Sequence, residues 1–344
     1  MALLMLLDGN SLTYRAFFAL PTTMATASGQ VTNAVYGFTS MLVNLIKERQ
    51  PDQLVVAFDR PEPTFRHEMI PSYKATRSEA PDILRQQMGL VRQLVETMQI
   101  PVVEAPGFEA DDVLATLATK AAAAGDDVIV VTGDRDAYQL VEDPHIKVLY
   151  VLRGVSEYVL YDEAKIAERT GVTPRQYPEF AALRGDPSDN LPGVPGVGEK
   201  TAAKLINTYG DLDTVYAHLD DLTPKLRESL VGAEPSVRSN AMATPLVRDL
   251  PISIDLAAAP LGGWDEAELR RLFAFLEFGP ALWDRFVAAT GVGKPSASEA
   301  SAVPGEQLAL SVEALTGAAD AARLLNSWEH ERPELAIAPS WEGP

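Results

Sequence analysis

Short apolar runs alternate with amphipathic stretches over the first 150 residues of the chain. The apolar runs predict strands at Leu3–Leu7, Leu54–Phe58, Pro101–Glu104, Asp127–Val131 and Ile146–Tyr150. Between them, apolar residues recur three and four positions apart, which predicts helices around Ala34–Arg49, Asp82–Met98 and Asp111–Ala123. This alternation indicates an α/β fold with a mostly parallel central sheet flanked by helices.

The pattern changes three times further along the chain. We expect an α/β core over residues 1–165 and a mostly helical region over 166–290. Residues 291–307 are rich in Gly, Ser, Pro and Ala, which is typical of a linker. Residues 308–344 are too few to form a domain alone, and Leu335–Ala338 has the pattern of a first strand. The sequence therefore predicts that a further domain begins here and is truncated.

Acidic residues follow the predicted strands. In an open parallel sheet the carboxyl ends of the strands meet at one edge, where ligands bind. The first four strands and the helical region deliver nine carboxylates that we expect at this edge: Asp8, Asp59, Glu109, Asp111, Asp112, Asp134, Asp136, Asp186 and Asp189. Each one alone could be a turn residue, a helix cap or a first-turn charge. Nine together would repel one another without cations, which favours a metal site.

Composition narrows the chemistry of that site. The chain has no cysteine and four histidines that are scattered along it, so thiolate and histidine metal sites are unfavoured. Oxygen ligands favour Mg²⁺ or Mn²⁺, and two such ions about 3.5–4 Å apart can hydrolyse a phosphodiester. The net charge of −19 is unfavourable for binding nucleic acid. The total charge is nevertheless weak evidence, because binding depends on where the charges lie on the surface. No membrane span or secretory signal is predicted, so we expect a cytoplasmic, nucleoid-associated protein.

The connection over residues 60–80 is long and carries cations and an aromatic residue. Lys74 and Arg77 would share a face if Ser72–Arg77 were helical, and Tyr73 could stack on a nucleobase. The alternative is a solvated loop. Because the segment leaves from the acidic edge, we expect its cations to hold a phosphate there.

Residues 184–204 join Asp186 and Asp189 to a glycine-rich turn and a Lys-bearing helix. The stretch 190–206 matches the helix-hairpin-helix pattern and predicts a clamp for the phosphates of a duplex. The expected contacts come from the turn and the start of the helix: Gly193, Val194, Gly196, Gly198, Lys200, Thr201 and Lys204.

Six motifs in this order resemble the 5′-nuclease (flap endonuclease) family, and more closely the N-terminal 5′→3′ exonuclease domains of bacterial type I DNA polymerases. They are Asp8–Asn10, Ala57–Pro61, Tyr73–Arg77, Gly107–Asp112, Thr132–Asp136 and Arg184–Lys204. The resemblance covers roughly residues 1–290. It implies a PIN-like nuclease core with an arch at 60–80, and a tail at 308–344 that starts a 3′–5′ exonuclease-like domain.

The resemblance also implies roles for single residues. One metal would lie on Asp8, Asp59, Glu109 and Asp111. A second would lie on Asp134, Asp136, Asp186 and Asp189, with Asp111 and Asp112 near both. Lys74 and Arg77 would steer the scissile phosphate beside Asp134 and Asp136, and a K⁺ ion would sit at the helix-hairpin-helix. Because Pro61, Pro63 and Pro71 interrupt the arch, a continuous long helix is not expected there.

The implied activity is a metal-dependent 5′ nuclease acting at 5′ flaps, nicks and RNA-primed ends in replication and excision repair. Its expected partners are branched or nicked duplex DNA and the polymerase portion of a longer chain, and we expect a monomer. Two alternatives remain open: a non-catalytic module that binds branched DNA, and a compact α/β ribonuclease. The first does not explain nine acids, and the second would lack the helical region.

Overall fold

The computed structural model describes residues 2–77, 79–154, 156–254, 261–262 and 264–291. The chain divides into a compact unit, Met1–Lys294, and a second unit, Pro295–Pro344. Almost all of the predicted linker, the predicted domain start at 308–344 and the predicted strand Leu335–Ala338 lie outside the described residues. No helix in the described part of the chain is both long and apolar enough to cross a membrane.

A six-stranded sheet lies at the centre of the first unit, in the order β3-β2-β1-β4-β5-β6. Its strands are β1 (Leu3–Asp8), β2 (Gln53–Ala57), β3 (Val102–Val103), β4 (Asp127–Thr132), β5 (Ile146–Arg153) and β6 (Glu157–Tyr161). The first five pair in parallel, and β6 pairs antiparallel with β5. This confirms the predicted mostly parallel sheet. Strand β6 was not predicted from the sequence, and β3 is shorter than predicted.

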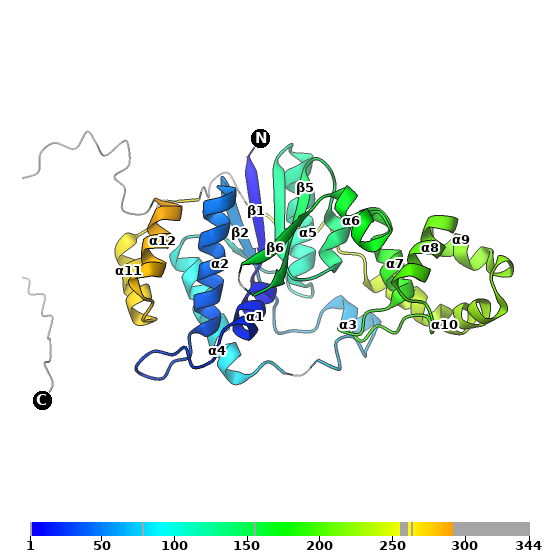
Figure 1. Ribbon diagram of the computed structural model, residues 1–344, viewed down its shortest axis with the longest axis horizontal. Coiled ribbons are helices and arrows are strands. Elements are labelled where there is room, and N and C mark those ends of the chain that lie inside the picture. The colour runs from blue at the N-terminus through cyan, green and yellow to red at the C-terminus, as the bar shows by residue number, and fades with distance from the viewer. Residues whose placement is uncertain (1, 78, 155, 255–260, 263, 292–344) are drawn as a thin grey trace, which may run out of the picture. The chain divides into compact units, whose positions relative to one another are not determined.

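Helices cover both faces of the sheet (Figure 1). On β1, Met5 and Leu7 face one core, and Leu4 and Leu6 face the other. The first core is covered by α1 (Gly9–Ala19), α2 (Asn33–Arg49), α4 (Asp82–Thr97), α11 (Glu266–Phe275) and α12 (Pro280–Thr290). The second core is covered by α5 (Ala110–Ala123) and η1 (Asp136–Leu140). Strand residues are therefore buried on both sides, which explains their continuous apolar runs.

The helical region continues the second core. It contains α6 (Glu163–Thr170), η2 (Pro174–Gln176), α7 (Tyr177–Arg184), α8 (Glu199–Tyr209), α9 (Leu212–Ala217), η3 (Leu219–Asp221) and α10 (Pro224–Ala243). Phe180, Ile206 and Val237 from three of these helices are almost fully buried in the same cluster as Leu6. After α10 the chain returns along α5, where the Nζ of Lys120 donates to the carbonyls of Leu250 and Ile252. The shared apolar cluster packs the α7–α8 region against the sheet.

The predicted arch at 60–80 contains one short helix, α3 (Phe65–Met69), followed by turns from Pro71 to Thr76. The structure has no long helix across the described residues of this segment, as the prolines predicted. The condition for a shared face, a helix over Ser72–Arg77, is not met, because the segment forms turns and Lys74 has a φ of 55°.

Candidate active site

The ends of four neighbouring strands bring carboxylates to one edge of the sheet. Asp8 is the last residue of β1, Asp59 follows β2, and Asp134 follows β4. Glu109 and Asp111 lie at the start of α5, which follows β3. All five line one cleft of about 630 Å³, together with Lys74 and Arg77 of the arch. We call this cleft the main cleft.

Asp8 is buried and hydrogen-bonded at the N-terminus of α1. Its Oδ1 accepts from the backbone N–H of Ser11 at 2.9 Å, and its Oδ2 accepts from the Thr132 hydroxyl at 2.7 Å. Burial, with a further contribution from the negative charge of Asp59, raises the pKa of Asp8 to about 7. Asp8 is therefore the N-cap of α1 and not merely a turn residue, and its pKa is nevertheless raised.

Asp111 carries an unsatisfied oxygen. Its Oδ1 is buried and has no hydrogen-bond partner among the described residues. Burial and then repulsion from Asp134, Asp8 and Asp59 raise the pKa of Asp111 well above its ordinary value. A buried polar atom without a partner is costly, and a bound cation would satisfy it. The donor set around Asp111 consists of carboxylate oxygens, which suits a hard divalent ion.

Asp134 and Asp136 begin the turn into η1. The backbone N–H of Asp136 donates to Oδ1 of Asp134 at 2.9 Å, while the N–H of Asp134 donates to the Thr132 hydroxyl. Burial raises the pKa of both carboxyls, and the charge of Asp134 raises that of Asp136 further. Asp134 lines the main cleft, whereas Asp136, the first residue of η1, is not among the residues that line it.

Asp186 and Asp189 lie on a tight loop between α7 and α8. The backbones of Asp186 and Leu191 exchange two hydrogen bonds of 2.9 Å, which close the loop. Asp186 accepts from the N–H and hydroxyl of Ser188, and it lines a smaller cavity next to the main cleft. The loop crosses the chain so closely that a Cβ on Gly193 would lie 2.0 Å from the Arg184 carbonyl oxygen.

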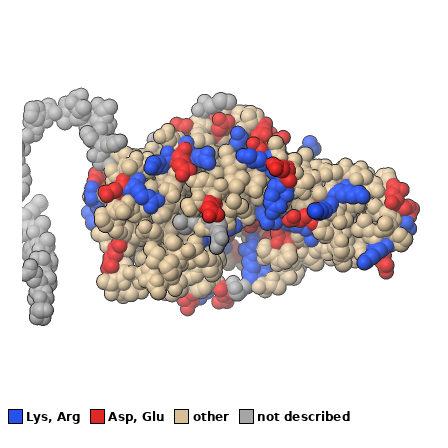
Figure 2. All heavy atoms as spheres, in the orientation of Figure 1, with Lys and Arg blue, Asp and Glu red and all other residues tan. Residues whose placement is uncertain are grey.

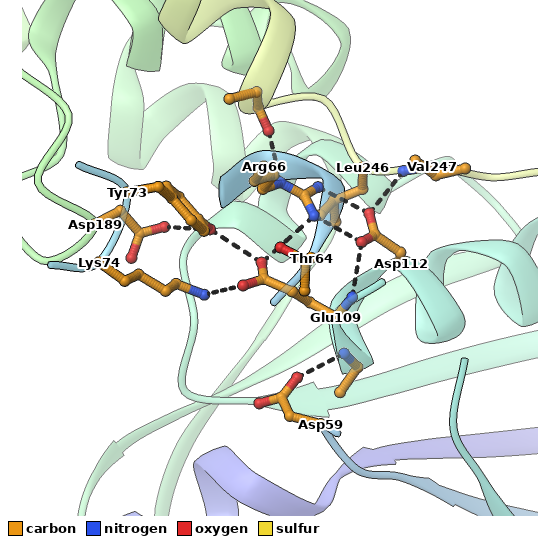
Figure 3. A network of polar contacts seen from close by, with 12 residues as sticks. Asp59, Thr64, Arg66, Tyr73, Lys74, Glu109, Asp112, Asp189, Leu246 and Val247 are labelled. Atoms are coloured by element: carbon orange, nitrogen blue, oxygen red, sulfur yellow. Dashed lines mark hydrogen bonds and ion pairs between the residues drawn. The ribbon is translucent and has the colours of Figure 1, made fainter. Parts of the chain in front are cut away.

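The arch neutralises two of the acids with its own side chains, and Figure 3 shows Lys74 and Tyr73 pointing toward these acids. Lys74 forms a short contact with Glu109, and Arg77 Nη2 lies 2.6 Å from Asp189 Oδ1. The Tyr73 hydroxyl lies 3.0 Å from Glu109 and 2.9 Å from Asp189. Burial alone would raise the pKa of Glu109, but the charges of Lys74 and Arg66 outweigh it and lower that pKa.

The expected stacking face of Tyr73 is not presented to solvent in this structure. The residue is 4% exposed, its ring packs edge-on against His67, and its hydroxyl serves the two carboxylates. Burial and the charges of Glu109 and Asp189 raise its pKa, so the hydroxyl keeps its proton and can donate. Tyr73 stays buried because its hydroxyl donates hydrogen bonds to the buried carboxylates of Glu109 and Asp189.

Asp112 is separated from the main cleft by a buried ion pair with Arg66 of α3. The guanidinium reaches both of its oxygens, at 2.6 and 2.8 Å, and the side chains are 2% and 0% exposed (Figure 3). Arg66 also donates to the Ala243 carbonyl at the end of α10, and Asp112 accepts from the N–H of Val247. Asp112 thus links the arch, α5 and the chain after α10, and the geometry does not support it as a metal ligand.

The glycine turn is only partly available to a ligand. Val194 is buried and its N–H donates to Leu183, so the expected contact from Val194 is not supported. Gly193 is required by the crossing at Arg184, whereas Gly196 has a φ of 83° and no atom near its missing Cβ. Gly198 caps α8, and Lys200 and Lys204 are exposed on that helix. The exposed part of the turn therefore comprises Gly196, Gly198 and the first turn of α8.

The carboxylates are not arranged as a metal site as they stand. In the described parts of the chain, no three acidic or histidine side chains lie where they could hold an ion together.

Arg66 was not predicted from the sequence, because one arginine in an arch that carries other cations has no pattern that marks it as buried. The structural role of Asp112 did have a signal in the sequence: Glu109 and Asp112 are three residues apart, which is the spacing of a capping box, and they form that box at the start of α5.

Comparison with known proteins identifies the family. The family model for the 5′-3′ exonuclease N-terminal resolvase-like domain matches residues 3–171, and that for the C-terminal SAM fold matches residues 172–267. DNA polymerase I of Mycobacterium tuberculosis is 48% identical over 89% of this chain and 34% of its own length. The thermostable DNA polymerase I of Thermus thermophilus is 37% identical over 98% of this chain and 38% of its own. The chain therefore spans about a third of the length of these relatives.

Solved structures support the same fold. A flap endonuclease of bacteriophage T5, in a pseudo-enzyme–product complex with DNA and metal ions, has a TM-score of 0.57 at 21% identity, over 83% of this chain and 97% of its own. The catalytic core of Rad2 in complex with DNA substrate has a TM-score of 0.54 at 20% identity, over 83% and 92%. With both family models matched in sequence order, the chain belongs to the 5′-3′ exonuclease family of nucleases.

Proposed function

We propose that the chain is a divalent-metal-dependent 5′→3′ exonuclease and flap endonuclease that acts on DNA at 5′ flaps, nicks and RNA-primed ends. The observation that carries the proposal is the unsatisfied oxygen of Asp111 among the carboxylates of the main cleft. The DNA and metal ions named for the T5 enzyme, and the DNA named for Rad2, support this substrate and cofactor class.

The proposed metal ligands form two groups. Asp8, Asp59, Glu109 and Asp111 would hold one Mg²⁺ or Mn²⁺ ion, and Asp134, Asp136, Asp186 and Asp189 would hold a second; Asp112 is left out because Arg66 occupies both its oxygens. Such ions lower the pKa of water and stabilise negative charge during phosphodiester hydrolysis.

The arch side chains would bind and orient the phosphate. Lys74 and Arg77 contact Glu109 and Asp189, two of the proposed ligands, so these carboxylates have either arch cations or a metal as partners. Burial lowers the pKa of Lys74, but Glu109 and Asp189 outweigh it and raise that pKa, so the ammonium keeps its charge. Released from the carboxylates, both cations would face a phosphate in the main cleft and offset its charge.

The duplex would lie on the exposed part of the glycine turn. Gly196, Gly198, Lys200, Thr201 and Lys204 are proposed to contact its backbone, with a K⁺ ion at the turn. Such contacts position DNA without reading its sequence. In the cell we propose that the chain works together with a polymerase portion, which the DNA polymerase I relatives support. We further propose that it acts in primer removal and excision repair, and as a monomer.

The test is cleavage of a labelled 5′-flap duplex in Mg²⁺ and in EDTA. We expect cleavage only with the metal, and a loss of at least about 10–100-fold in Asp134→Ala. Asp220→Ala is the matched control, because its carboxylate is 96% exposed on the helical region. Full activity in EDTA, or an Asp134→Ala variant that cuts like wild type, would contradict the proposal.

The remaining rival substrate is RNA. A compact ribonuclease would cut a single-stranded RNA at least as well as the flap duplex, whereas the helical region and its turn favour the duplex. Presenting both labelled substrates at equal concentration distinguishes the two.

A further inference from the structure

Three arginines from three different elements surround one carboxylate beside the main cleft. Glu199, the first residue of α8, lies 3.4 Å from Arg135, 3.8 Å from Arg184 and 3.9 Å from Arg169, measured between nitrogen and oxygen atoms. Arg135 follows β4, Arg169 lies near the end of α6, and Arg184 ends α7. We call these four residues the Glu199 cluster. Figure 2 shows Lys and Arg atoms gathered over the region of α7 and α8.

The Glu199 cluster and its neighbouring acid carry more positive than negative charge. A second carboxylate, Asp186, lies 3.7 Å from Arg184, so three cations face two anions, and one of these anions is a proposed metal ligand. Arg238 on α10 is the opposite case, because one cation lies between the carboxylates of Asp213 and Glu234. Loose exposed ion pairs contribute little to stability, so Glu199 is a weak competitor for these guanidinium groups.

The Glu199 cluster lies beside a cavity next to the main cleft, where a bound DNA strand would pass. A cavity of about 350 Å³ opens on Arg135, Arg184 and Glu199. It shares Asp134, Pro187 and Ser188 with the main cleft, so the two cavities adjoin one another. A strand whose scissile phosphate lies beside Asp134 would therefore pass Arg135 on its way to the glycine turn. The N-terminus of α8, an eleven-residue helix, adds partial positive charge at the same place.

We propose that the Glu199 cluster binds a backbone phosphate of the duplex strand between the main cleft and the glycine turn. Without DNA the three guanidinium groups lie near Glu199, and they exchange this weak partner for the phosphate when DNA binds. Guanidinium groups are well suited to this exchange, because their planar donors fit phosphate and carboxylate alike. The inference rests on the proposed function, which supplies the DNA.

The cluster makes predictions of opposite sign for its two kinds of residue. Arg135→Gln and Arg169→Gln remove a phosphate contact, so each should weaken binding of a 5′-flap duplex about three- to tenfold at moderate salt. Each should also reduce the slope of log affinity against log salt by about 1. Glu199→Gln removes the competing carboxylate and should bind DNA more tightly than wild type. Arg184 is left intact, because its side chain is 15% exposed and packs on Phe180.

The experiment measures affinity by titration in EDTA over a series of salt concentrations, and steady-state cleavage in Mg²⁺. The Arg variants should raise KM with kcat unchanged, and Arg238→Gln, 39% exposed beside its own carboxylates, is the control that should change neither measurement. Unchanged salt slopes in both Arg variants, or weaker binding by Glu199→Gln, would overturn the proposal. Failure of wild type to cleave in Mg²⁺ would instead refute the proposed function, while the salt slopes would still report on the cluster.

Discussion

Replacing Asp8 with asparagine should stabilise the metal-free protein at neutral pH. Asp8 is 5% exposed, and burial with the charge of Asp59 raises its pKa from 3.8 to about 7. Between these two values the folded state keeps a proton that the unfolded state has released. The free energy of unfolding therefore falls as pH rises through this window, which is the reverse of the usual case for a carboxylate.

The magnitude follows from the shift in pKa. A shift of about 3 units corresponds to roughly 4 kcal/mol at pH values above 7, as an upper bound. The asparagine side chain would keep an amide oxygen for the Ser11 N–H, but it would lose the anionic acceptor of the Thr132 hydroxyl, at a cost of about 1 kcal/mol. We expect Asp8→Asn to be more stable than wild type by about 3 kcal/mol at pH 8, and equal within about 1 kcal/mol at pH 4.

The measurement is urea unfolding in EDTA at several pH values between 4 and 8, with wild type and variant compared at each pH. Taking this difference removes the contribution of every carboxyl that titrates alike in both proteins. Asp220→Asn, at an exposed carboxylate, should differ from wild type by less than about 0.5 kcal/mol throughout. Adding Mg²⁺ at pH 8 should stabilise wild type more than Asp8→Asn, because the variant lacks one proposed ligand.

Two results would refute the reasoning. One is a difference in stability between Asp8→Asn and wild type that stays constant from pH 4 to pH 8, which would mean that Asp8 does not retain its proton. The other is a variant that is less stable at pH 8, which would mean that the hydrogen bonds to Ser11 and Thr132 outweigh burial and repulsion.

Three other substitutions test the structure around the site, each by urea unfolding. Arg66→Met leaves the Asp112 carboxylate buried without its partner and should cost about 3–5 kcal/mol, of which Asp112→Asn in the same chain should restore a part. Gly193→Ala should cost more than about 2 kcal/mol, because its Cβ would meet the Arg184 carbonyl, whereas Gly198→Ala, with open space and a φ of −95°, should be tolerated. Lys74→Met should cost about 1–3 kcal/mol at pH 7 and less below pH 4, because the lowered pKa of Glu109 stabilises the fold only while that carboxyl is ionised.

Strand-end acids were predictable because the position of a parallel strand's carboxyl end follows from topology alone. Asp8, Asp59 and Asp134 meet in the main cleft for this reason, and no knowledge of side-chain contacts was needed. Asp112 shows where topology stops being sufficient. It differs from Asp111 by one helical position, about 100° around α5, which turns it from the cleft to Arg66. The sequence could not reveal that partner, which lies 46 residues away in a segment without a helical pattern.

The sequence predicted that Lys74 and Arg77 lie at the acidic edge, but it did not predict that they contact Glu109 and Asp189. A lysine and an arginine that leave the acidic edge can face a phosphate or a carboxylate, and both contacts satisfy the same donors. In the structure Lys74 and Arg77 contact the carboxylates of Glu109 and Asp189, because a buried charge without a partner costs more free energy than an ordered arch. Tyr73 follows its neighbours inward for the same reason.

The main cleft therefore has two ways of limiting its negative charge. Glu109 and Asp189 are paired with cations of the arch, whereas burial and repulsion raise the pKa values of Asp8 and Asp111 and so favour their protonated forms. The proposed ion that shares Asp8, Asp111 and Glu109 must displace a proton from Asp8 and Lys74 from Glu109, and the second ion must displace Arg77 from Asp189. Binding of the first ion should thus weaken as pH falls through the raised pKa of Asp8, while binding of either ion should depend on whether the arch cations hold Glu109 and Asp189. A phosphate that engages Lys74 and Arg77 would free those carboxylates, so substrate and metal should each favour the binding of the other.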